Sequence, residues 1–267
     1  MGVSVSVLAS GSRGNSAIIA SSSTRILVDA GVSCREIFKR MKTIGEDPHS
    51  LSAILITHEH SDHITGLRTL SRKLGVPVFM TGATHQAWAR AERDDDGVMP
   101  EVCKLEVFAS GHCFQIGDIA VTPFTIPHDA ADPVGFTFRA EGIKVGVVTD
   151  LGYLPLSVID HLRGCDALVI ESNHDLEMLR GGPYPWSVKQ RVMSRVGHLS
   201  NDALADFFCN DYDGEAAYVV LAHISEQNNH PEVARAAAEH ALGKRRTLLH
   251  NRVILAQQSE PTEPIRL

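Results

Sequence analysis

Short runs of β-branched and other apolar residues recur along the chain, and each run ends in small or polar residues. This pattern is typical of buried strands and predicts them at residues 3–10, 17–20, 25–31, 52–58, 119–128, 134–142, 144–150, 167–172 and 216–223. Apolar positions at helical spacing predict helices at residues 34–45, 63–75, 84–93, 185–197, 200–211 and 230–244. Several of these helices begin with Ser, Thr, Asn or Pro and end near Gly, which supports their boundaries.

The order of these elements indicates the fold class. Strands dominate the first half, and strand and helix alternate again after residue 143. Two sheets covered by outer helices fit this order better than one doubly wound sheet, so we expect an α+β fold, a four-layer αββα sandwich. Without an internal repeat or a long linker, residues 1–255 are expected to form a single domain. The polar, Pro-containing segment 256–267 is expected to be a loosely ordered tail.

Composition narrows the class of protein. The chain has 267 residues, 43% of them hydrophobic, and a formal net charge of −7, as expected of a globular protein with a substantial core. The negative charge argues against wholesale coating of nucleic acid, although it allows a local basic groove. Five widely spaced cysteines without a CxxC motif favour a reducing, cytoplasmic location. No apolar stretch approaches the roughly 20 residues that a membrane span needs.

The most informative stretch is THEHSDHITGL, residues 57–67, which directly follows the apolar run AILI. It places His58, His60, Asp62 and His63 within six positions, at a turn from a strand into a helix. Such a turn lets side chains converge, and imidazole and carboxylate are ligands for Zn²⁺, Mn²⁺ or Fe. The alternative, a polar helix cap, leaves three crowded histidines unexplained.

Three more candidate ligands stand at the end of an apolar strand in the same way. His128 follows TPFTIP, Asp150 follows VGVVT, and His223 follows YVVLA. A single histidine at a strand end is most often a structural or surface residue. The repetition at four strand ends favours one shared metal site.

This order of motifs, HxHxDH followed by His, Asp and His at strand ends, resembles the metallo-β-lactamase superfamily over residues 3 to about 225. The resemblance implies the αββα sandwich and a dinuclear metal site. In that site His58, His60 and His128 would hold one metal, Asp62, His63 and His223 would hold the other, and Asp150 would bridge them. The cofactors implied are two divalent ions, Zn²⁺ or Mn²⁺.

Further motifs narrow the branch of the superfamily. True β-lactamases carry Cys where this chain has Asp150, and DHITGL resembles the DHIxGL of RNase Z and related phosphodiesterases rather than the DHxGG of glyoxalase II. Together with SGSRGNS, ESNHD and GHLSN, it is most similar to the YycJ/WalJ group of small exonuclease-like proteins. The segment between Asp150 and His223 is too short for the β-CASP domain that RNase J-type enzymes insert.

The resemblance implies a dinuclear-metal phosphohydrolase that acts on nucleic acid through a metal-bridging hydroxide. DNA is favoured over RNA as the substrate, and the digestion is expected to run from 5′ to 3′. Asp62 and Asp150 would hold the metals that share the hydroxide, and His198 of GHLSN would transfer a proton to the leaving oxygen. Oligomeric state stays open.

Candidate substrate contacts come from the loops around these motifs. They are Ser10, Ser12 and Asn15 of SGSRGNS, Ser200 and Asn201 of GHLSN, and Lys189 of the segment RGGPYPWSVKQR, which also contains Arg180, Tyr184, Trp186 and Arg191. Asn173 and His174 of ESNHD are expected to orient metal ligands. Each has a purely structural alternative, namely a tight turn, a helix cap or a packed loop.

Two rival functions remain. The same metal site would also suit a thioester or lactone hydrolase of the glyoxalase II-like branch, which needs no basic groove. A scaffold protein with structural metals is the other rival. The complete ligand set and the candidate acid His198 favour an enzyme over the scaffold.

Overall fold

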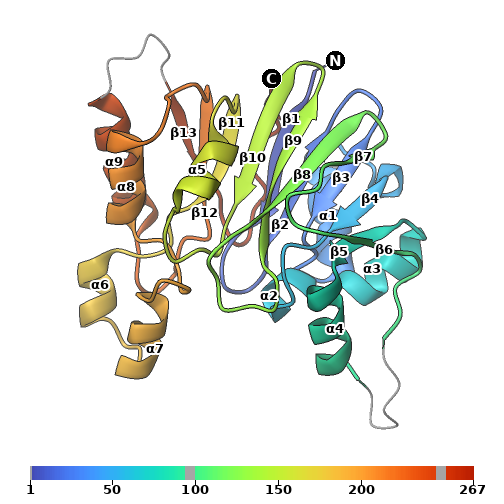
Figure 1. The fold of residues 1–267 in the computed structure, drawn as a ribbon, viewed down its shortest axis with the longest axis horizontal. Coiled ribbons are helices and arrows are strands. Elements are labelled where there is room, and N and C mark those ends of the chain that lie inside the picture. Colours follow the sequence, from blue (N-terminus) through green and yellow to red (C-terminus); the bar gives the residue numbers. More distant parts are fainter. Residues whose placement is uncertain (1, 94–99, 245–250) are drawn as a thin grey trace.

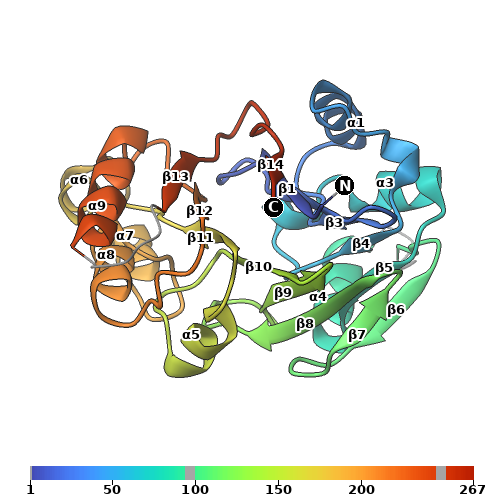
Figure 2. The same cartoon turned by 90° about the horizontal axis from the view of Figure 1, so that it is seen from above.

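Two sheets stand face to face in the computed structural model, which describes residues 2–93, 100–244 and 251–267 (Figures 1 and 2). Within these residues each sheet has seven strands. The first runs in the order β14 (Ile265–Arg266), β1 (Ser4–Ala9), β2 (Ser16–Ala20), β3 (Arg25–Val28), β4 (Ala53–Leu55), β5 (Val78–Thr81) and β6 (Leu105–Phe108). The second runs in the order β13 (Arg252–Leu255), β12 (Tyr218–Ala222), β11 (Ala167–Glu171), β10 (Ile143–Val148), β9 (Val134–Ala140), β8 (Ile119–Thr125) and β7 (Phe114–Ile116).

Helices cover the outer face of both sheets. Leu27 and Ile54 of the first sheet share an outer apolar cluster with Ile37, Leu70 and Trp88, which belong to α1 (Cys34–Thr43), α3 (Leu67–Leu74) and α4 (Gly82–Ala91). The second sheet is covered in the same way by α5 (Leu156–Leu162), α8 (Asn201–Asn210) and α9 (Pro231–Gly243). The predicted four-layer αββα sandwich is therefore confirmed.

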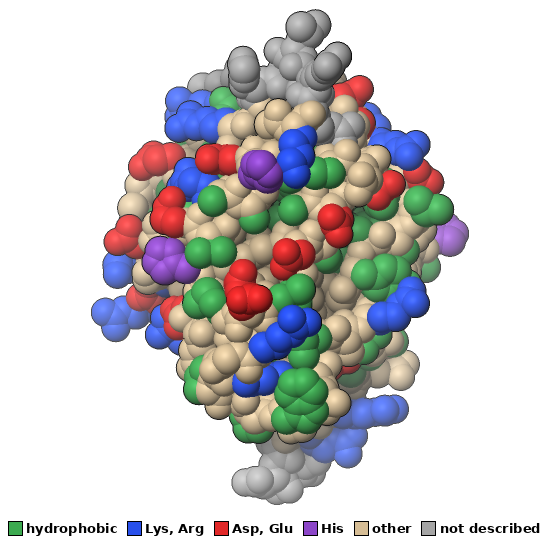
Figure 3. Space-filling model, turned by 90° about the vertical axis from the view of Figure 1, so that its left-hand side faces the viewer, with side chains coloured by type: hydrophobic (Ala, Val, Ile, Leu, Met, Phe, Trp, Pro, Cys, Tyr) green, Lys and Arg blue, Asp and Glu red, His purple; other side chains and the backbone are tan. Residues whose placement is uncertain are grey.

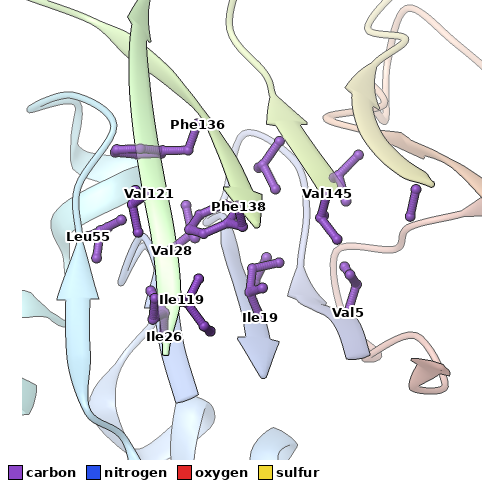
Figure 4. Packing of buried hydrophobic residues seen from close by; sticks show 14 of the residues in the cluster. Val5, Ile19, Ile26, Val28, Leu55, Ile119, Val121, Phe136, Phe138 and Val145 are labelled. Carbon is purple, nitrogen blue, oxygen red and sulfur yellow. The ribbon is translucent and has the colours of Figure 1, made fainter. Parts of the chain in front are cut away.

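The inner core lies between the two sheets (Figure 4). Ile19, Val28 and Leu55 of the first sheet face Val121 and Phe136 of the second, and all five are buried. Because helices cover the outer faces, every residue of β2 and β11 is buried, which explains why these strands read as continuous apolar runs rather than alternating ones.

Strand direction determines where the functional residues meet. β10, β11 and β12 pair in parallel, and β8 runs in the same direction because both it and β10 are antiparallel to β9. Their carboxyl ends therefore share one edge of the second sheet. The same end of the molecule carries the short helix α2 (Ser61–Ile64), flanked by α4 on one side and by α6 (Leu176–Gly181) and α7 (Trp186–Val192) on the other (Figure 1).

The helix predicted at residues 63–75 is divided into α2 and α3 by a turn at Thr65 and Gly66. At this turn the chain lies against the loop after β3, where Gly66 N–H donates to the Ala30 carbonyl oxygen (2.7 Å). A Cβ at Gly66 would overlap the Val32 carbonyl oxygen, and one at Gly31 would overlap the Asp62 carbonyl oxygen. These glycines allow the histidine motif to dock closely on the first sheet.

The expectation of a loosely ordered tail at residues 256–267 is wrong. β14 pairs with β1 at the edge of the first sheet, with Ile265 opposite Val5. Thr262 is buried and its Oγ1 accepts a hydrogen bond from Val7 N–H (2.9 Å), while Arg40 donates to the Gln258 carbonyl oxygen (2.9 Å). Part of the segment's polarity therefore satisfies the edge of a sheet and a buried guanidinium, while other polar side chains such as Glu260 and Glu263 are exposed.

The hydrophobic pattern of the sequence did not predict several short elements. These are β5, β6, β7, β13 and β14, the helices α5 and α6, and a 3₁₀ turn at Pro48–Ser50. All are only two to seven residues long, and a run of this length gives a weak periodic signal.

Candidate metal centre

The structure brings all seven candidate ligands together at the strand ends. The ligand atoms of His58, His60 and His128 form one group in which all lie within 4.8 Å of one another. Asp62, His63, Asp150 and His223 form a second group, whose ligand atoms also lie within 4.8 Å of one another. Residues from strand ends distant in sequence thus converge on one place.

Hydrogen bonds orient the histidines of the first group. His128 Nδ1 lies 3.2 Å from the Gly197 carbonyl oxygen, an acceptor, so the proton belongs on Nδ1 and Nε2 carries the lone pair. Nε2 in turn lies 3.2 Å from His60 Nδ1. His58 Nδ1 lies 3.0 Å from Thr57 Oγ1, whereas its buried Nε2 has no hydrogen-bond partner among the described residues.

That unpartnered nitrogen fits a metal ligand. Burial and the neighbouring His63 hold the pKa of His58 well below its usual range, so the imidazole is neutral and its lone pair is available. A buried polar atom without a partner is costly in a folded protein unless something binds it. The donor set of nitrogens with carboxylate oxygens is suited to a divalent metal.

Asp29 orients His63 in the second group. Its Oδ2 lies 2.8 Å from His63 Nδ1, and its carboxylate also accepts from the Thr57 N–H (2.8 Å) and hydroxyl. The Nδ1 proton of His63 therefore points to Asp29, leaving Nε2 toward Asp62 and Asp150. Burial alone would lower the pKa of His63, but the carboxylates of Asp150 and Asp29 raise this pKa well above its usual range.

Asp150 lies between partners on either side. Its Oδ2 is 3.3 Å from His63 Nε2 and its Oδ1 is 3.4 Å from His223 Nε2. Burial opposes ionisation, but His223 and His63 overcome it and hold the pKa of Asp150 well below its usual range. Asp29, Asp150 and His223 all have positive φ, a backbone region that non-glycine residues rarely adopt. Such strain is often concentrated at functional sites.

Glu171, at the end of β11, was not among the predicted site residues. Its Oε1 lies 2.8 Å from His198 Nδ1 and 3.2 Å from His223 Nδ1, so one carboxylate orients both histidines. Its Oε2 accepts from Leu151 N–H (3.0 Å) and Leu199 N–H (3.1 Å). Burial raises the pKa of Glu171, but the neighbouring His198 lowers it by more, to about 2. The sequence could have indicated Glu171, because it ends the apolar strand ALVIE in the same way as His128, Asp150 and His223 follow apolar strands.

His198 lies beside the ligands with its side chain 21% exposed. Its ring stacks on His223 with centroids 5.1 Å apart and lies 5.4 Å from that of His128. Burial lowers the pKa of His198, but Glu171 reverses this and raises it above its usual value. Since Nδ1 faces Glu171, Nε2 is the atom left to exchange a proton.

Two of the three predicted contacts in the glycine-rich loop, Ser10 and Asn15, have structural partners. Ser10 is buried, and its Oγ accepts from His223 N–H (2.6 Å). Asn15 Oδ1 accepts from Gly11 N–H (2.9 Å), while its Nδ2 donates to Asp62 Oδ2 (3.2 Å). Both residues therefore support candidate ligands. Ser12 alone of the three is exposed.

The remaining predicted contacts are also committed to the protein. Ser200 caps α8 by accepting from Ala203 N–H (3.1 Å), and the buried Asn201 bonds to Ser172 and Asn229. Lys189 is buried, and its Nζ donates to the Arg180 carbonyl oxygen (2.7 Å). The expectation that Lys189 contacts substrate is therefore corrected, because its ammonium is already bound inside the protein.

The other residues singled out near the site differ in how far they match their predicted roles. Asn173 Nδ2 donates to the His223 carbonyl oxygen (2.8 Å), which is the orienting role predicted for it. Arg191 Nε pairs with Asp129 Oδ2 (2.5 Å) next to His128, and Trp186 is exposed on α7. His174 is buried with an unpartnered Nδ1 among the described residues, so no orienting bond is seen for it.

Comparison with known proteins identifies the family. Residues 24–224 match the β-lactamase superfamily domain. The chain belongs to the metallo-β-lactamase superfamily. It is 40% identical to exodeoxyribonuclease YycJ of Bacillus anthracis over 91% of this chain and 90% of that protein. It is 36% identical to exodeoxyribonuclease WalJ of Streptococcus pneumoniae over 88% of this chain and 86% of that protein. The predicted membership of the YycJ/WalJ group is therefore confirmed.

The fold agrees with this membership. The metallo-β-lactamase fold protein YhfI of Bacillus subtilis superposes with a TM-score of 0.72, covering 98% of this chain and all of that one, at 16% identity. At this low sequence identity, the structural similarity supports a shared fold and nothing about function. Across the described residues, no helix has the length and apolar character to cross a membrane.

Proposed function

We propose that this chain is a metal-dependent exonuclease that degrades DNA from the 5′ end. The superfamily membership makes it a metal-dependent hydrolase of the nuclease branch. The observation that supports DNA as the substrate is the sequence similarity to YycJ and WalJ. This similarity extends over about nine tenths of the chain, and both relatives are named exodeoxyribonucleases. The direction of digestion is our own proposal.

The metal ligands are proposed from the two groups of side chains. His58, His60 and His128 would hold one divalent ion, and Asp62, His63 and His223 would hold a second. Asp150 belongs to the second group, and its charge also acts on His58 of the first, so it would bridge the two ions. Two such ions, Zn²⁺ or Mn²⁺, would activate water and neutralise charge on a phosphodiester.

His198 is proposed as the general acid. Glu171 stabilises its protonated form and fixes Nδ1, so a proton on Nε2 would be delivered to the leaving oxygen of the cleaved strand. His198 Nε2 would then regain a proton from solvent, which reaches the partly exposed ring. Asp29 and Asn173 hold His63 and His223 in place throughout.

Location in the cytoplasm belongs to the same proposal. All five cysteines are free, Cys34 and Cys165 being buried and Cys103 and Cys113 exposed. Burial raises the pKa of the Cys165 thiol to about 12, so it stays protonated and unreactive. Free thiols of this kind suit a reducing compartment.

The proposal is tested by digesting DNA and RNA strands, single and double, that are labelled at the 5′ or the 3′ end, with Mn²⁺ or Zn²⁺ supplied. We expect the 5′ label to appear at once in mononucleotides, the 3′ label to be released last, and circular single strands to resist. Release from the 3′ end, or cutting of the circle, would disprove the direction. Activity on a thioester or lactone but on no phosphodiester would favour the glyoxalase II-like alternative.

A further inference from the structure

Six exposed cations gather on two neighbouring helices of the first sheet. Arg35, Lys39 and Lys42 lie on α1, and Arg68, Arg72 and Lys73 lie on α3; together we call them the basic face. Counting the buried Arg40, the two helices carry seven basic side chains and one acid, Glu36. The chain as a whole has 32 acids and 25 bases, so this concentration of positive charge runs against its overall balance.

Within the described parts of the chain, no acidic side chain neutralises the basic face. None of its six cations forms an ion pair with any residue that the structure describes, and Glu36 is paired with Arg40 (3.5 Å). On α3, Arg68, Thr69, Arg72 and Lys73 line an open depression of about 600 Å³. Lys73 Nζ lies 4.6 Å above the Phe38 ring, which links α3 to α1. Uncompensated charges of one sign attract a polyanion.

Short connections fix the basic face relative to the metal centre. Only Thr65 and Gly66 separate α2, which carries His63, from α3. Ala30 N–H donates to the His63 carbonyl oxygen (2.8 Å), and the Ala30 carbonyl oxygen accepts from Gly66 N–H (2.7 Å). Arg68 and Arg72, one helical turn apart, therefore start a positive surface that leads away from the candidate active site.

Around α6 to α9, the described residues form no comparable surface. Acidic and basic side chains are interspersed there (Figure 3). Lys189 is buried, and Arg191 is paired with Asp129. On this side Arg180 and Arg195 are exposed and have no ion pair among the described residues, but they lie on separate segments. The side that carries α1 and α3 places six such cations on two neighbouring helices.

We propose that the basic face binds the phosphate backbone of the DNA strand beyond the nucleotides being cleaved. This inference rests on the proposed nuclease function. Guanidinium and ammonium groups bind phosphates without regard to base, as an exonuclease that moves along any sequence requires. The backbone would leave the metal centre past α2 and follow Arg68 and Arg72 toward α1.

The test compares two charge reversals of equal size. In the variant R68E/R72E the basic face loses two cations, whereas in the control R139E/R163E two exposed cations on β9 and at the end of α5 are reversed. Binding of the metal-loaded protein to 5′-phosphorylated phosphorothioate strands, one too short to reach α3 and one long, is measured by fluorescence anisotropy across a salt series. Hydrolysis of bis(p-nitrophenyl) phosphate reports on the metal centre itself.

We expect R68E/R72E to weaken binding of the long strand by about tenfold or more at low salt and to lower the salt slope by roughly 1.4, about 0.7 per lost phosphate contact. Binding of the short strand and hydrolysis of the small diester should match the wild type. The control should bind both strands like the wild type. Equal binding of the long strand by both variants, or equal losses on the two strands, would overturn the proposal.

The DNA-binding proposal and the nuclease proposal can fail independently of each other. If the wild type binds long DNA through Arg68 and Arg72 yet degrades none, the nuclease proposal fails and the binding surface stands. If the wild type degrades DNA and R68E/R72E binds and digests long strands normally, the surface fails and the nuclease stands. Retention of an acidic protein but no DNA by the wild type would assign the basic face to another partner and refute this one.

Discussion

Glu171 Oε1 lies 2.8 Å from His198 Nδ1, and this contact fixes which nitrogen of His198 is left for chemistry. The same oxygen lies 3.2 Å from His223 Nδ1, so a single buried carboxylate sets the orientation of a candidate acid and of a candidate metal ligand. Both histidines need a partner of this kind, because an unrestrained imidazole can present either nitrogen.

Replacing Glu171 by Gln should therefore impair His198 without removing it. The amide keeps an oxygen for Leu151 N–H and Leu199 N–H but removes the negative charge that stabilises the protonated imidazole. We expect kcat on DNA to fall by about 10- to 100-fold with a smaller change in KM. Steady-state kinetics check this, with Glu226→Gln on the surface as the control. An unchanged kcat would show that the charge of Glu171 is dispensable.

His198→Ala should lower turnover on DNA by roughly 10²- to 10⁴-fold, the usual contribution of a general acid. Bound metal should stay the same, because His198 lies outside the seven proposed ligands. A p-nitrophenolate leaving group needs little protonation, so hydrolysis of a p-nitrophenyl phosphodiester should suffer much less. Equal defects on both substrates would count against His198 as the acid. The exposed His49→Ala serves as the control.

Asp150→Asn tests the bridging position. Asn tolerates the positive φ of residue 150 (61°), so the backbone should be retained while the carboxylate charge is lost. We expect less metal per chain by elemental analysis, and activity lower by about 100-fold or more on every substrate. Glu141→Gln is a matched control, since Glu141 also has positive φ (52°) but lies in the turn between β9 and β10. Full metal content and activity in Asp150→Asn would refute the bridge.

Stability should depend on pH through His174. Burial lowers the pKa of His174 to about 4 in the folded protein, against about 6.5 in an unfolded chain. The unfolded state therefore binds this proton first, and stability falls as the pH drops from about 6.5 to about 4, by on the order of 3 kcal/mol. Urea unfolding of metal-free protein at several pH values should show a shallower acid loss in His174→Gln than in His49→Gln. Identical slopes would contradict the burial effect.

The C-terminal segment should contribute measurably to stability. Thr262→Val keeps the shape of the side chain but leaves the buried Val7 N–H without the oxygen that it bonds to at 2.9 Å. We expect the free energy of unfolding to fall by about 1–3 kcal/mol, the cost of an unsatisfied buried donor. Thr125→Val, at an exposed hydroxyl on β8, should have little effect in the same urea titration. A loosely ordered tail would make the two variants indistinguishable.

The sequence by itself determined the elements that local pattern encodes. Continuous apolar runs marked the strands buried on both faces, and the polar residues that end those runs marked all seven residues that the structure gathers. The motif THEHSDHITGL and its companions were also sufficient to place the chain in its superfamily. These features are local, so they are readable without knowing which segments meet.

Only the tertiary structure decided the partners of these residues. Asp29 and Glu171 select the free nitrogens of His63 and His198 across 34 and 27 positions of the chain, and no local pattern specifies such pairings. Likewise Ser10 supports His223, Lys189 is turned inward to Arg180, and residues 256–267 complete the sheet beside β1. A polar side chain looks the same in a sequence whether it faces substrate or satisfies a buried backbone group, and burial alone distinguishes the two.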